Sequence, residues 1–278
     1  MVATCDWVDV GSGLKAYYGA PEGAGPHPCI LVYIEAFGVN EHFKKLTKRL
    51  ADEGFATITP DIYGGDTYSY DDMDGAIGKL KTMDDDTVIS QTEACLKWLG
   101  GRAEADSNRA GVTGFCMGGR FTFLANAELA NHFKGAAAFY GGGIGPIEDG
   151  LGRKTLLERV PEFVSPILLW YGSEDQSILP DELGRIAQTM AQEKKQYTLT
   201  CFPNVGHGFF CEDRGSYDRH AAESSFKATV DFFRAEVVGN RRQKDLGLSI
   251  WEASRGNGGW LSQADGRRGV GIIVESIG

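Results

Sequence analysis

The chain has 278 residues, of which 42% are hydrophobic and 24% are charged, as is typical of soluble globular proteins. Its 28 basic and 38 acidic residues give a formal net charge of -10, which would repel both nucleic acid and anionic membranes. We therefore expect neither of these as a partner and a small molecule as the ligand.

The N-terminal sequence MVATCDWVDV lacks the basic and long apolar regions of a signal peptide. No stretch approaches the roughly 18 uninterrupted apolar residues of a membrane span, so we expect a cytoplasmic protein. The cysteines are scattered without CxxC pairs, which disfavours a disulfide framework or a zinc ribbon. They are Cys5, Cys29, Cys95, Cys116, Cys201 and Cys211.

The hydrophobic pattern predicts strands and helices along most of the chain. Short apolar runs indicate strands, and apolar residues spaced three and four apart indicate helices. In chain order we expect a hairpin over 4–18, a strand over 29–34, a helix over 40–53, a strand over 55–59, a helix over 84–99, a strand over 109–113, a helix over 117–131, strands over 135–140 and 166–171, a helix over 180–192, a strand over 197–202 and a helix over 217–237.

Apolar strands that alternate with amphipathic helices indicate a mostly parallel, doubly wound α/β sheet with an N-terminal hairpin. In such sheets, ligand sites lie at the carboxyl ends of the strands. We assign this domain to residues 1–238. Residues 239–278 are rich in glycine and show no clear period, so we treat them as a C-terminal tail of unknown role.

One predicted strand ends in a turn that is typical of a catalytic nucleophile. Residues 111–119 read GVTGFCMGG, so that Gly-x-Cys-x-Gly joins a strand directly to a helix. Gly114 and Gly118 leave space where side chains would collide with neighbouring backbone, and the helix N-terminus favours a Cys116 thiolate. The alternative is a small cysteine buried in a glycine-rich turn. We interpret Cys116 as the nucleophile.

An acid and a histidine follow two later strands. Asp175 comes just after the strand over 166–171, and His207 just after the strand over 197–202. Nucleophile, acid and histidine in this chain order are typical of α/β-hydrolases, in which the acid orients the histidine and the histidine acts as base. Glu174 is the nearest alternative acid, and a turn or capping role is an alternative for Asp175.

The remaining histidines offer no comparable position, because His27, His42, His132 and His220 fall on predicted turns or helices. Cys201, His207 and Cys211 are metal-ligating residue types, but their spacing fits no recognised zinc pattern. We predict no metal site.

These residues and motifs resemble the dienelactone hydrolases, also called carboxymethylenebutenolidases, a family of the α/β-hydrolase superfamily. The resemblance extends from about Cys29 to Phe233, and the combination of motifs is specific. The matching stretches are 33–41 (YIEAFGVNE), 60–63 (PDIY), 114–119 (GFCMGG), 139–142 (FYGG), 172–175 (GSED) and 206–208 (GHG).

The resemblance implies roles for three further residues. Glu35 corresponds to a carboxylate beside the cysteine that holds the resting thiol and accepts its proton when substrate displaces it. A capping role at the helix that begins near residue 40 is the alternative. The backbone N–H groups of Ala36 and Met117 correspond to the oxyanion hole, whose donors face the charge that develops during the reaction.

The chain departs from the family where the substrate is bound. In well-known members an arginine that helps to bind the substrate carboxylate follows the histidine by four residues, a position that is Cys211 here. Arg214 is a nearby substitute, and we place it among the candidate residues of the substrate pocket; a solvent-facing position, as most arginines adopt, is the alternative. A second family arginine should lie in the region 63–86, which offers only Lys79 and Lys81. The preference for an anionic lactone is therefore in doubt.

Four aromatic residues near strand ends would line an apolar substrate pocket, although core packing is the alternative. They are Phe37, Tyr63, Tyr140 and Phe209.

The sequence thus predicts a cysteine-dependent hydrolase of small esters or lactones that acts through an acyl-enzyme and needs no metal or organic cofactor. Two alternatives remain open. One is a thiol-dependent acyl-transfer or redox enzyme, and the other is a noncatalytic binding protein with the same fold. The sequence does not indicate the oligomeric state.

Overall fold

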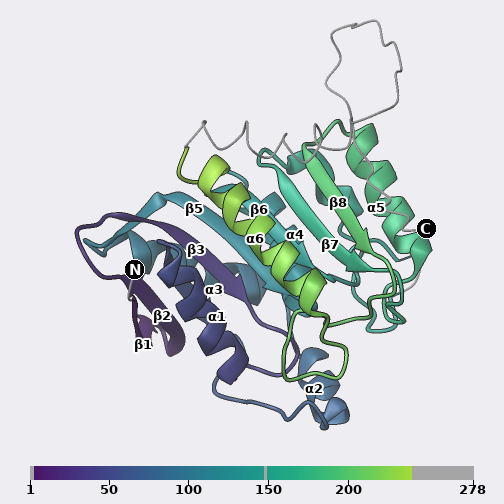
Figure 1. The fold of residues 1–278 in the computed structure, drawn as a ribbon, viewed down its shortest axis with the longest axis horizontal. Coiled ribbons are helices and arrows are strands. Elements are labelled where there is room, and N and C mark those ends of the chain that lie inside the picture. Colours follow the sequence, from purple (N-terminus) through teal and green to yellow (C-terminus); the bar gives the residue numbers. More distant parts are fainter. Residues whose placement is uncertain (1–2, 147–148, 240–278) are drawn as a thin grey trace, which may run out of the picture.

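The computed structural model describes residues 3–146 and 149–239. They form an eight-stranded sheet in the order β1-β2-β4-β3-β5-β6-β7-β8, with helices on both faces (Figure 1). The elements are β1 (Ala3–Gly11), β2 (Leu14–Pro21), β3 (His27–Tyr33), α1 (Glu41–Asp52), β4 (Ala56–Pro60), α2 (Met73–Leu80), α3 (Asp85–Gly100), β5 (Ala105–Phe115), α4 (Met117–Glu128), β6 (Phe133–Phe139), the 3-10 helix η1 (Leu157–Glu162), β7 (Ile167–Gly172), α5 (Pro180–Gln192), β8 (Tyr197–Phe202) and α6 (Arg219–Glu236).

The sheet is parallel except at its N-terminal edge. Strands β1 and β2 form an antiparallel hairpin, and β2 pairs antiparallel with β4. From β4 through β3 and β5 to β8, every neighbouring pair is parallel. The predicted fold class, a mostly parallel α/β sheet with an N-terminal hairpin, is confirmed.

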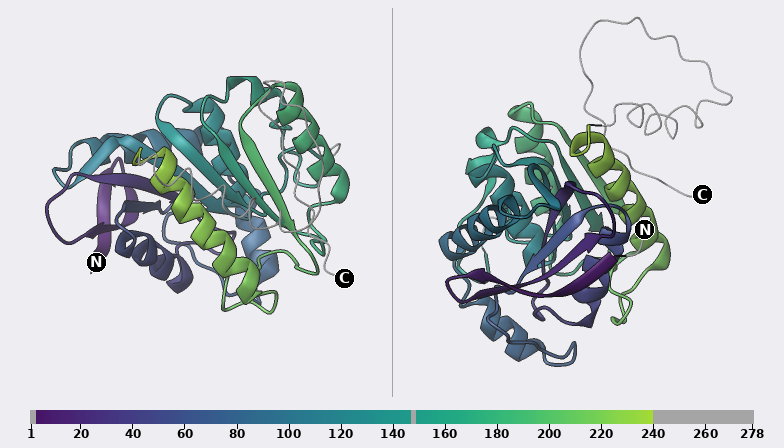
Figure 2. Two further views of the ribbon diagram at one scale, coloured as in Figure 1. Left: turned by 45° about the horizontal axis from the view of Figure 1, so that its top comes forward. Right: turned by 90° about the vertical axis from the view of Figure 1, so that its left-hand side faces the viewer.

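The helices divide between the two faces of the sheet. Helices α1 and α6 cover one face, and α3 and α4 cover the other (Figures 1 and 2). Helix α6 comes close to the strands because glycines lie beneath it. A Cβ at Gly111 of β5 would lie 2.9 Å from the Phe233 ring, and a Cβ at Gly135 of β6 would lie 2.8 Å from the Phe232 ring.

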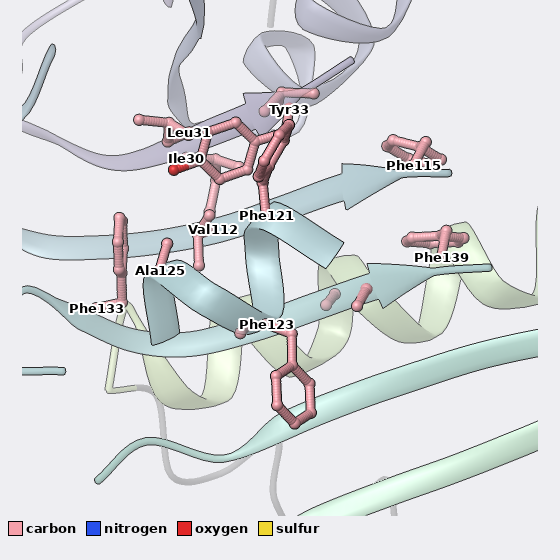
Figure 3. Packing of buried hydrophobic residues seen from close by; sticks show 14 of the residues in the cluster. Ile30, Leu31, Tyr33, Val112, Phe115, Phe121, Phe123, Ala125, Phe133 and Phe139 are labelled. Atoms are coloured by element: carbon pink, nitrogen blue, oxygen red, sulfur yellow. The ribbon is translucent and has the colours of Figure 1, made fainter. Parts of the chain in front are cut away.

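The hydrophobic core extends to the carboxyl ends of the central strands. Tyr33 of β3 packs against Phe121 of α4, with ring centroids 5.9 Å apart. Phe115 and Phe139, the last residues of β5 and β6, stack with centroids 4.4 Å apart (Figure 3). The strand ends that precede the candidate site are therefore fixed by tight aromatic packing.

A buried arginine holds the loop after β6. The Arg120 side chain is fully buried, and its guanidinium bonds Asp85 at the start of α3 through Nη1 (2.5 Å) and Nη2 (2.9 Å). It also donates to the carbonyl oxygens of Gly143 (3.0 Å) and Lys154 (3.2 Å). Since a buried charge needs partners, these bonds join α3, α4 and this loop into one unit.

Two helices were not predicted from the sequence. Helix α2 is only eight residues long, contains two glycines and buries only Ala76, so its hydrophobic pattern is weak. The helix η1 contains Pro161, which argues against a regular helix in the sequence. Other differences are at element ends: β5 begins earlier than residue 109, α4 ends at Glu128, and α6 begins at Arg219.

The domain boundaries of residues 1–238 stay a prediction. Apart from Gly239, the predicted tail lies outside the described residues. Within 3–146 and 149–239, no helix has both the length and the apolar character needed to cross a bilayer.

Candidate active site

Cys116 lies in the sharp turn between β5 and α4. Its backbone has φ 56° and ψ -118°, a strained conformation for a residue other than glycine. A Cβ at Gly114 would lie 2.2 Å from the Gly118 carbonyl oxygen, and a Cβ at Gly118 would lie 2.6 Å from the Ile34 carbonyl oxygen. Only glycines permit this approach, which holds the start of α4 against the end of β3.

His207 and Asp175 form a hydrogen-bonded pair after β8 and β7. The distance between His207 Nδ1 and Asp175 Oδ2 is 2.7 Å. The other carboxylate oxygen of Asp175 accepts from the backbone N–H groups of Ser177 (2.8 Å) and Ile178 (3.1 Å), which fixes its orientation. Glu174 is exposed, so the structure brings Asp175, and not its sequence neighbour, to the histidine.

The Cys116 side chain lies close enough to His207 to act on it electrostatically. Burial lowers the pKa of His207, but the negative charge of Cys116 and the hydrogen bonds to Asp175 and Cys116 outweigh burial, so that the pKa is raised overall. Raising this pKa favours the imidazolium form of His207. The arrangement can therefore generate a nucleophile and a general acid in one step.

Glu35 follows β3 and is fully buried. Its Oε1 accepts a hydrogen bond from the Tyr140 hydroxyl (2.8 Å), and its Oε2 accepts one from Arg214 Nη1 (3.3 Å). In this structure, the carboxylate expected to hold the resting Cys116 thiol is therefore bonded to a phenol and a guanidinium.

Arg214 points inward and does not face solvent. Its side chain is 15% exposed, forms the ion pair with Glu35 and lies 5.5 Å from the Phe37 ring centroid. The absence of a side chain at Gly208 makes this placement possible, because a Cβ there would lie 2.2 Å from Arg214 Nη1. The inward position of Arg214 depends on its ion pair with Glu35, which is far away in the sequence. The residues next to Arg214 therefore do not predict it.

The two expected oxyanion donors belong to adjoining segments. Ala36 follows Glu35 after the end of β3, and Met117 is the first residue of α4, directly after Cys116. The contact between Gly118 and the end of β3 brings these two segments together. N–H groups at a helix N-terminus are suited to binding negative charge.

The model of the Dienelactone hydrolase family matches residues 14–237. The chain belongs to the dienelactone hydrolase family. This membership makes it a carboxylic ester hydrolase with a small-molecule ester or lactone substrate.

Relatives in sequence and structure agree with this assignment. The chain is 32% identical over 224 residues to a Methylorubrum extorquens protein named as a carboxymethylenebutenolidase, covering 80% of this chain and 76% of the relative. It is 30% identical over 229 residues to an Escherichia coli K12 protein of the same name, covering 81% and 83%. A Klebsiella pneumoniae structure described as a dienelactone hydrolase has a TM-score of 0.77 and 28% identity, covering 84% of this chain and 99% of that one.

The four aromatic residues that were predicted to line the pocket pack among the residues of the candidate site. Phe37 and Phe209 are buried, and the Tyr63 hydroxyl lies 3.4 Å from Met117 Sδ. The Tyr140 ring centroid is 5.1 Å from those of His207 and Phe209. That these aromatics line a substrate pocket stays a prediction.

Lys79 and Lys81, the other two candidates for binding a substrate carboxylate, are placed less favourably for this role than Arg214. Lys79 forms an ion pair with Asp66 (2.7 Å), and Lys81 is exposed. At the family's arginine position, the Cys211 Sγ lies 3.0 Å from the Tyr70 hydroxyl. Burial raises the pKa of Cys211 to about 11, which makes it a neutral thiol.

Sequence reasoning missed Tyr70. Its hydroxyl bonds both Cys211 and Asn40 Nδ2 (3.0 Å), and its ring packs edge-on against Phe37 at 4.7 Å. It thereby ties the segment before α2 to the loop that leads into α6, two segments that lie next to each other at the bottom of Figure 1. Because 141 residues separate Tyr70 from Cys211, no local pattern could have revealed this contact.

Among described residues, no group of three or more His, Cys, Asp or Glu side chains is arranged to hold a metal ion.

The placement of the acid and base leads to a test with a built-in control. We expect His207→Ala to lower kcat on p-nitrophenyl acetate on the order of a thousandfold or more, because the base is lost. Asp175→Asn should cost somewhat less, because it disturbs the tautomer and orientation of the base. Glu174→Gln, the matched change at the exposed neighbour, should remain close to wild type. A damaging Glu174→Gln beside a silent Asp175→Asn would show that the acid has been assigned wrongly.

Proposed function

We propose that this protein hydrolyses small esters and lactones through an acyl-enzyme on Cys116, with His207 as base and Asp175 as the residue that orients it. The observation that carries the proposal is the position of His207, whose Nδ1 is 2.7 Å from Asp175 Oδ2 and whose ring is close enough to Cys116 for the sulfur to act on it electrostatically. A histidine held in this way accepts a proton on the side of the nucleophile, as in hydrolytic triads.

In the first half of the proposed reaction, the thiol proton moves to His207 and the Cys116 sulfur attacks the acyl carbonyl carbon. The N–H groups of Ala36 and Met117 stabilise the tetrahedral oxyanion. As the intermediate collapses, the ester C–O bond breaks and His207 protonates the departing alkoxide. In a lactone, the alkoxide stays attached to the acyl group.

In the second half, His207 takes a proton from a water molecule, whose oxygen attacks the thioester carbonyl. The C–S bond then breaks, the carboxylic acid product leaves, and the proton returns to the sulfur. Asp175 stabilises the imidazolium in both halves. All steps use side chains and backbone groups of this chain together with water.

Two features of the site support a preference for neutral substrates. The Arg214 guanidinium is paired with Glu35, so the pair carries no net charge. Cys211, a buried thiol, occupies the position of the family arginine. A substrate carboxylate would have to compete with Glu35 for Arg214, whereas a free bidentate arginine would fix it in position and angle.

The assignment of the nucleophile is tested by Cys116→Ala and Cys116→Ser, assayed on p-nitrophenyl acetate without any added acyl acceptor. We expect Cys116→Ala to lose turnover while keeping its thermal unfolding midpoint, because only a small side chain is removed. Cys116→Ser should be weak, since a hydroxyl is far harder to ionise than a thiol. Cys5→Ala, a change at a half-buried cysteine in β1, is the control. More than trace activity in Cys116→Ala would refute the assignment, and turnover that requires an acceptor would indicate acyl transfer.

Substrate charge is tested by comparing kcat/KM for a neutral short-chain ester and for a carboxymethylene lactone. We expect the wild type to favour the neutral ester by about tenfold, because part of the orientation of the carboxylate is missing. Glu35→Gln should shift this ratio toward the lactone, since it leaves the Arg214 charge uncompensated, and Arg214→Ala should not. Using the ratio cancels losses common to both substrates. A wild-type preference of at least about tenfold for the lactone that collapses in Arg214→Ala would instead identify Arg214 as a relocated carboxylate clamp.

A further inference from the structure

Strand β8 lies at one edge of the sheet, and β1 lies at the other (Figure 1). Within residues 3–146 and 149–239, β8 pairs only with β7, so one side of its backbone has no strand partner there. All six residues of β8 are half-buried, whereas most residues of β6 and β7 inside the sheet are buried. The free side of β8 is therefore available to a further strand.

The backbone groups on this free side follow from the pairing with β7. The carbonyl oxygens of Gln196 and Phe202 accept hydrogen bonds from the β7 side, at 3.1 and 2.9 Å. Because the direction of the backbone groups alternates along a strand, those of Tyr197, Leu199 and Cys201 point away from β7. These three residues form the outward row of β8, and each offers one N–H donor and one carbonyl acceptor.

The two edges of the sheet differ in how they are protected against pairing. Proteins block a free edge with charged residues, prolines or bulges, because it is otherwise a template for another strand. Edge strand β1 carries Asp6 and Asp9, and its pairing register shifts between Asp9 and Gly11. Strand β8, with the sequence YTLTCF, has no charged residue and no proline, and its register with β7 is unbroken. Of the two edges, β8 is thus the one suited to pairing.

We propose that β8 pairs antiparallel with the β8 strand of a second copy of this chain, so that the two eight-stranded sheets continue into one. A twofold axis at Leu199, the middle of the outward row, pairs Leu199 with its own counterpart and Tyr197 with Cys201. Each pair exchanges N–H···O bonds in both directions, so the outward row is satisfied on both copies. Because the same surface is used on each copy, the assembly closes as a dimer.

Opposite charges at the two ends of β8 favour this antiparallel arrangement. Lys194 is exposed in the turn before β8, and Glu174 is exposed just beyond its other end, where its N–H bonds the Val205 carbonyl oxygen (2.9 Å). Within one chain, the six-residue strand keeps these two side chains about 20 Å or more apart. In the dimer, each lysine lies near the glutamate of the second copy. This attraction opposes the repulsion from the net charge of -10 on each copy.

A hollow beside the start of β8 adds to the surface that a second copy would cover. It has a volume of about 560 Å³, and its lining includes Pro166, Tyr197 and Phe232. Lys195 also lines it, and in the proposed register Pro203 of the second copy comes opposite Lys195. Apolar contacts there supplement the strand pairing, which alone covers less surface than a stable interface needs.

Sedimentation velocity of the full chain over a range of concentrations tests the pairing. We expect the wild type to form a dimer with twice the 30.2 kDa mass of one chain. Leu199→Pro should be a monomer, because proline removes an outward N–H and places its ring where the second strand would lie. Its circular dichroism should be unchanged, since an edge strand tolerates proline where the N–H faces outward. Leu199→Val, which keeps the N–H, is the matched control and should remain a dimer.

A charge-reversal cycle tests the arrangement independently of proline. Lys194→Glu and Glu174→Lys should each raise the dimer dissociation constant about tenfold, since every dimer contains two such pairs. The double variant should return the dissociation constant close to its wild-type value. Because the two residues lie at opposite ends of β8 in one chain, only a contact between copies explains such a rescue.

A monomeric wild type would overturn the proposal, as would a dimer whose dissociation constant is unchanged by Leu199→Pro. If the monomeric wild type protected the Leu199 amide from hydrogen exchange, another part of the same chain would be the occupant of the edge. Losses from the two charge variants that add in the double variant would contradict the antiparallel arrangement. If Leu199→Pro fails to fold, the charge-reversal cycle decides.

Discussion

The close packing at the turn between β5 and α4 is the constraint on which the site depends. Gly114 lets this turn close on Gly118, and Gly118 in turn lies against the end of β3. The nucleophile candidate Cys116 therefore shares one fixed unit with Glu35 and Ala36, which follow β3. A side chain at either glycine would push α4 away from the end of β3, and with it Cys116 from Glu35 and from Ala36, a candidate oxyanion donor.

Around this turn, charged groups that are removed from water have partners. Asp175 is paired with His207, and Glu35 is paired with Arg214. Burying an unpaired charge would be costly, so these pairs also hold loops from β3, β7 and β8 in register with one another. The bond to Asp175 also helps to raise the pKa of His207 against the opposing effect of burial.

The sequence was informative where a local pattern carries the structure. Alternating apolar strands and amphipathic helices predicted the sheet, and the strand-end positions of Cys116, Asp175 and His207 follow from that pattern. It was uninformative where contacts join distant segments. The inward turn of Arg214 depends on Glu35, 179 residues away, and the bond between Tyr140 and Glu35 spans 105 residues. Helix α2 was missed because its few buried residues form no hydrophobic period.

The most direct test of covalent catalysis is to mix the enzyme with p-nitrophenyl acetate, quench the mixture in acid within one turnover and map the acetyl group by peptide mass spectrometry. We predict an acetyl group on the Cys116 sulfur that forms as p-nitrophenol is released and decays at the rate of acetate production. In His207→Ala, its decay should slow. Hydrolysis at the full rate without acetylation of Cys116, or a kinetically competent acetyl group on another residue, would contradict the mechanism.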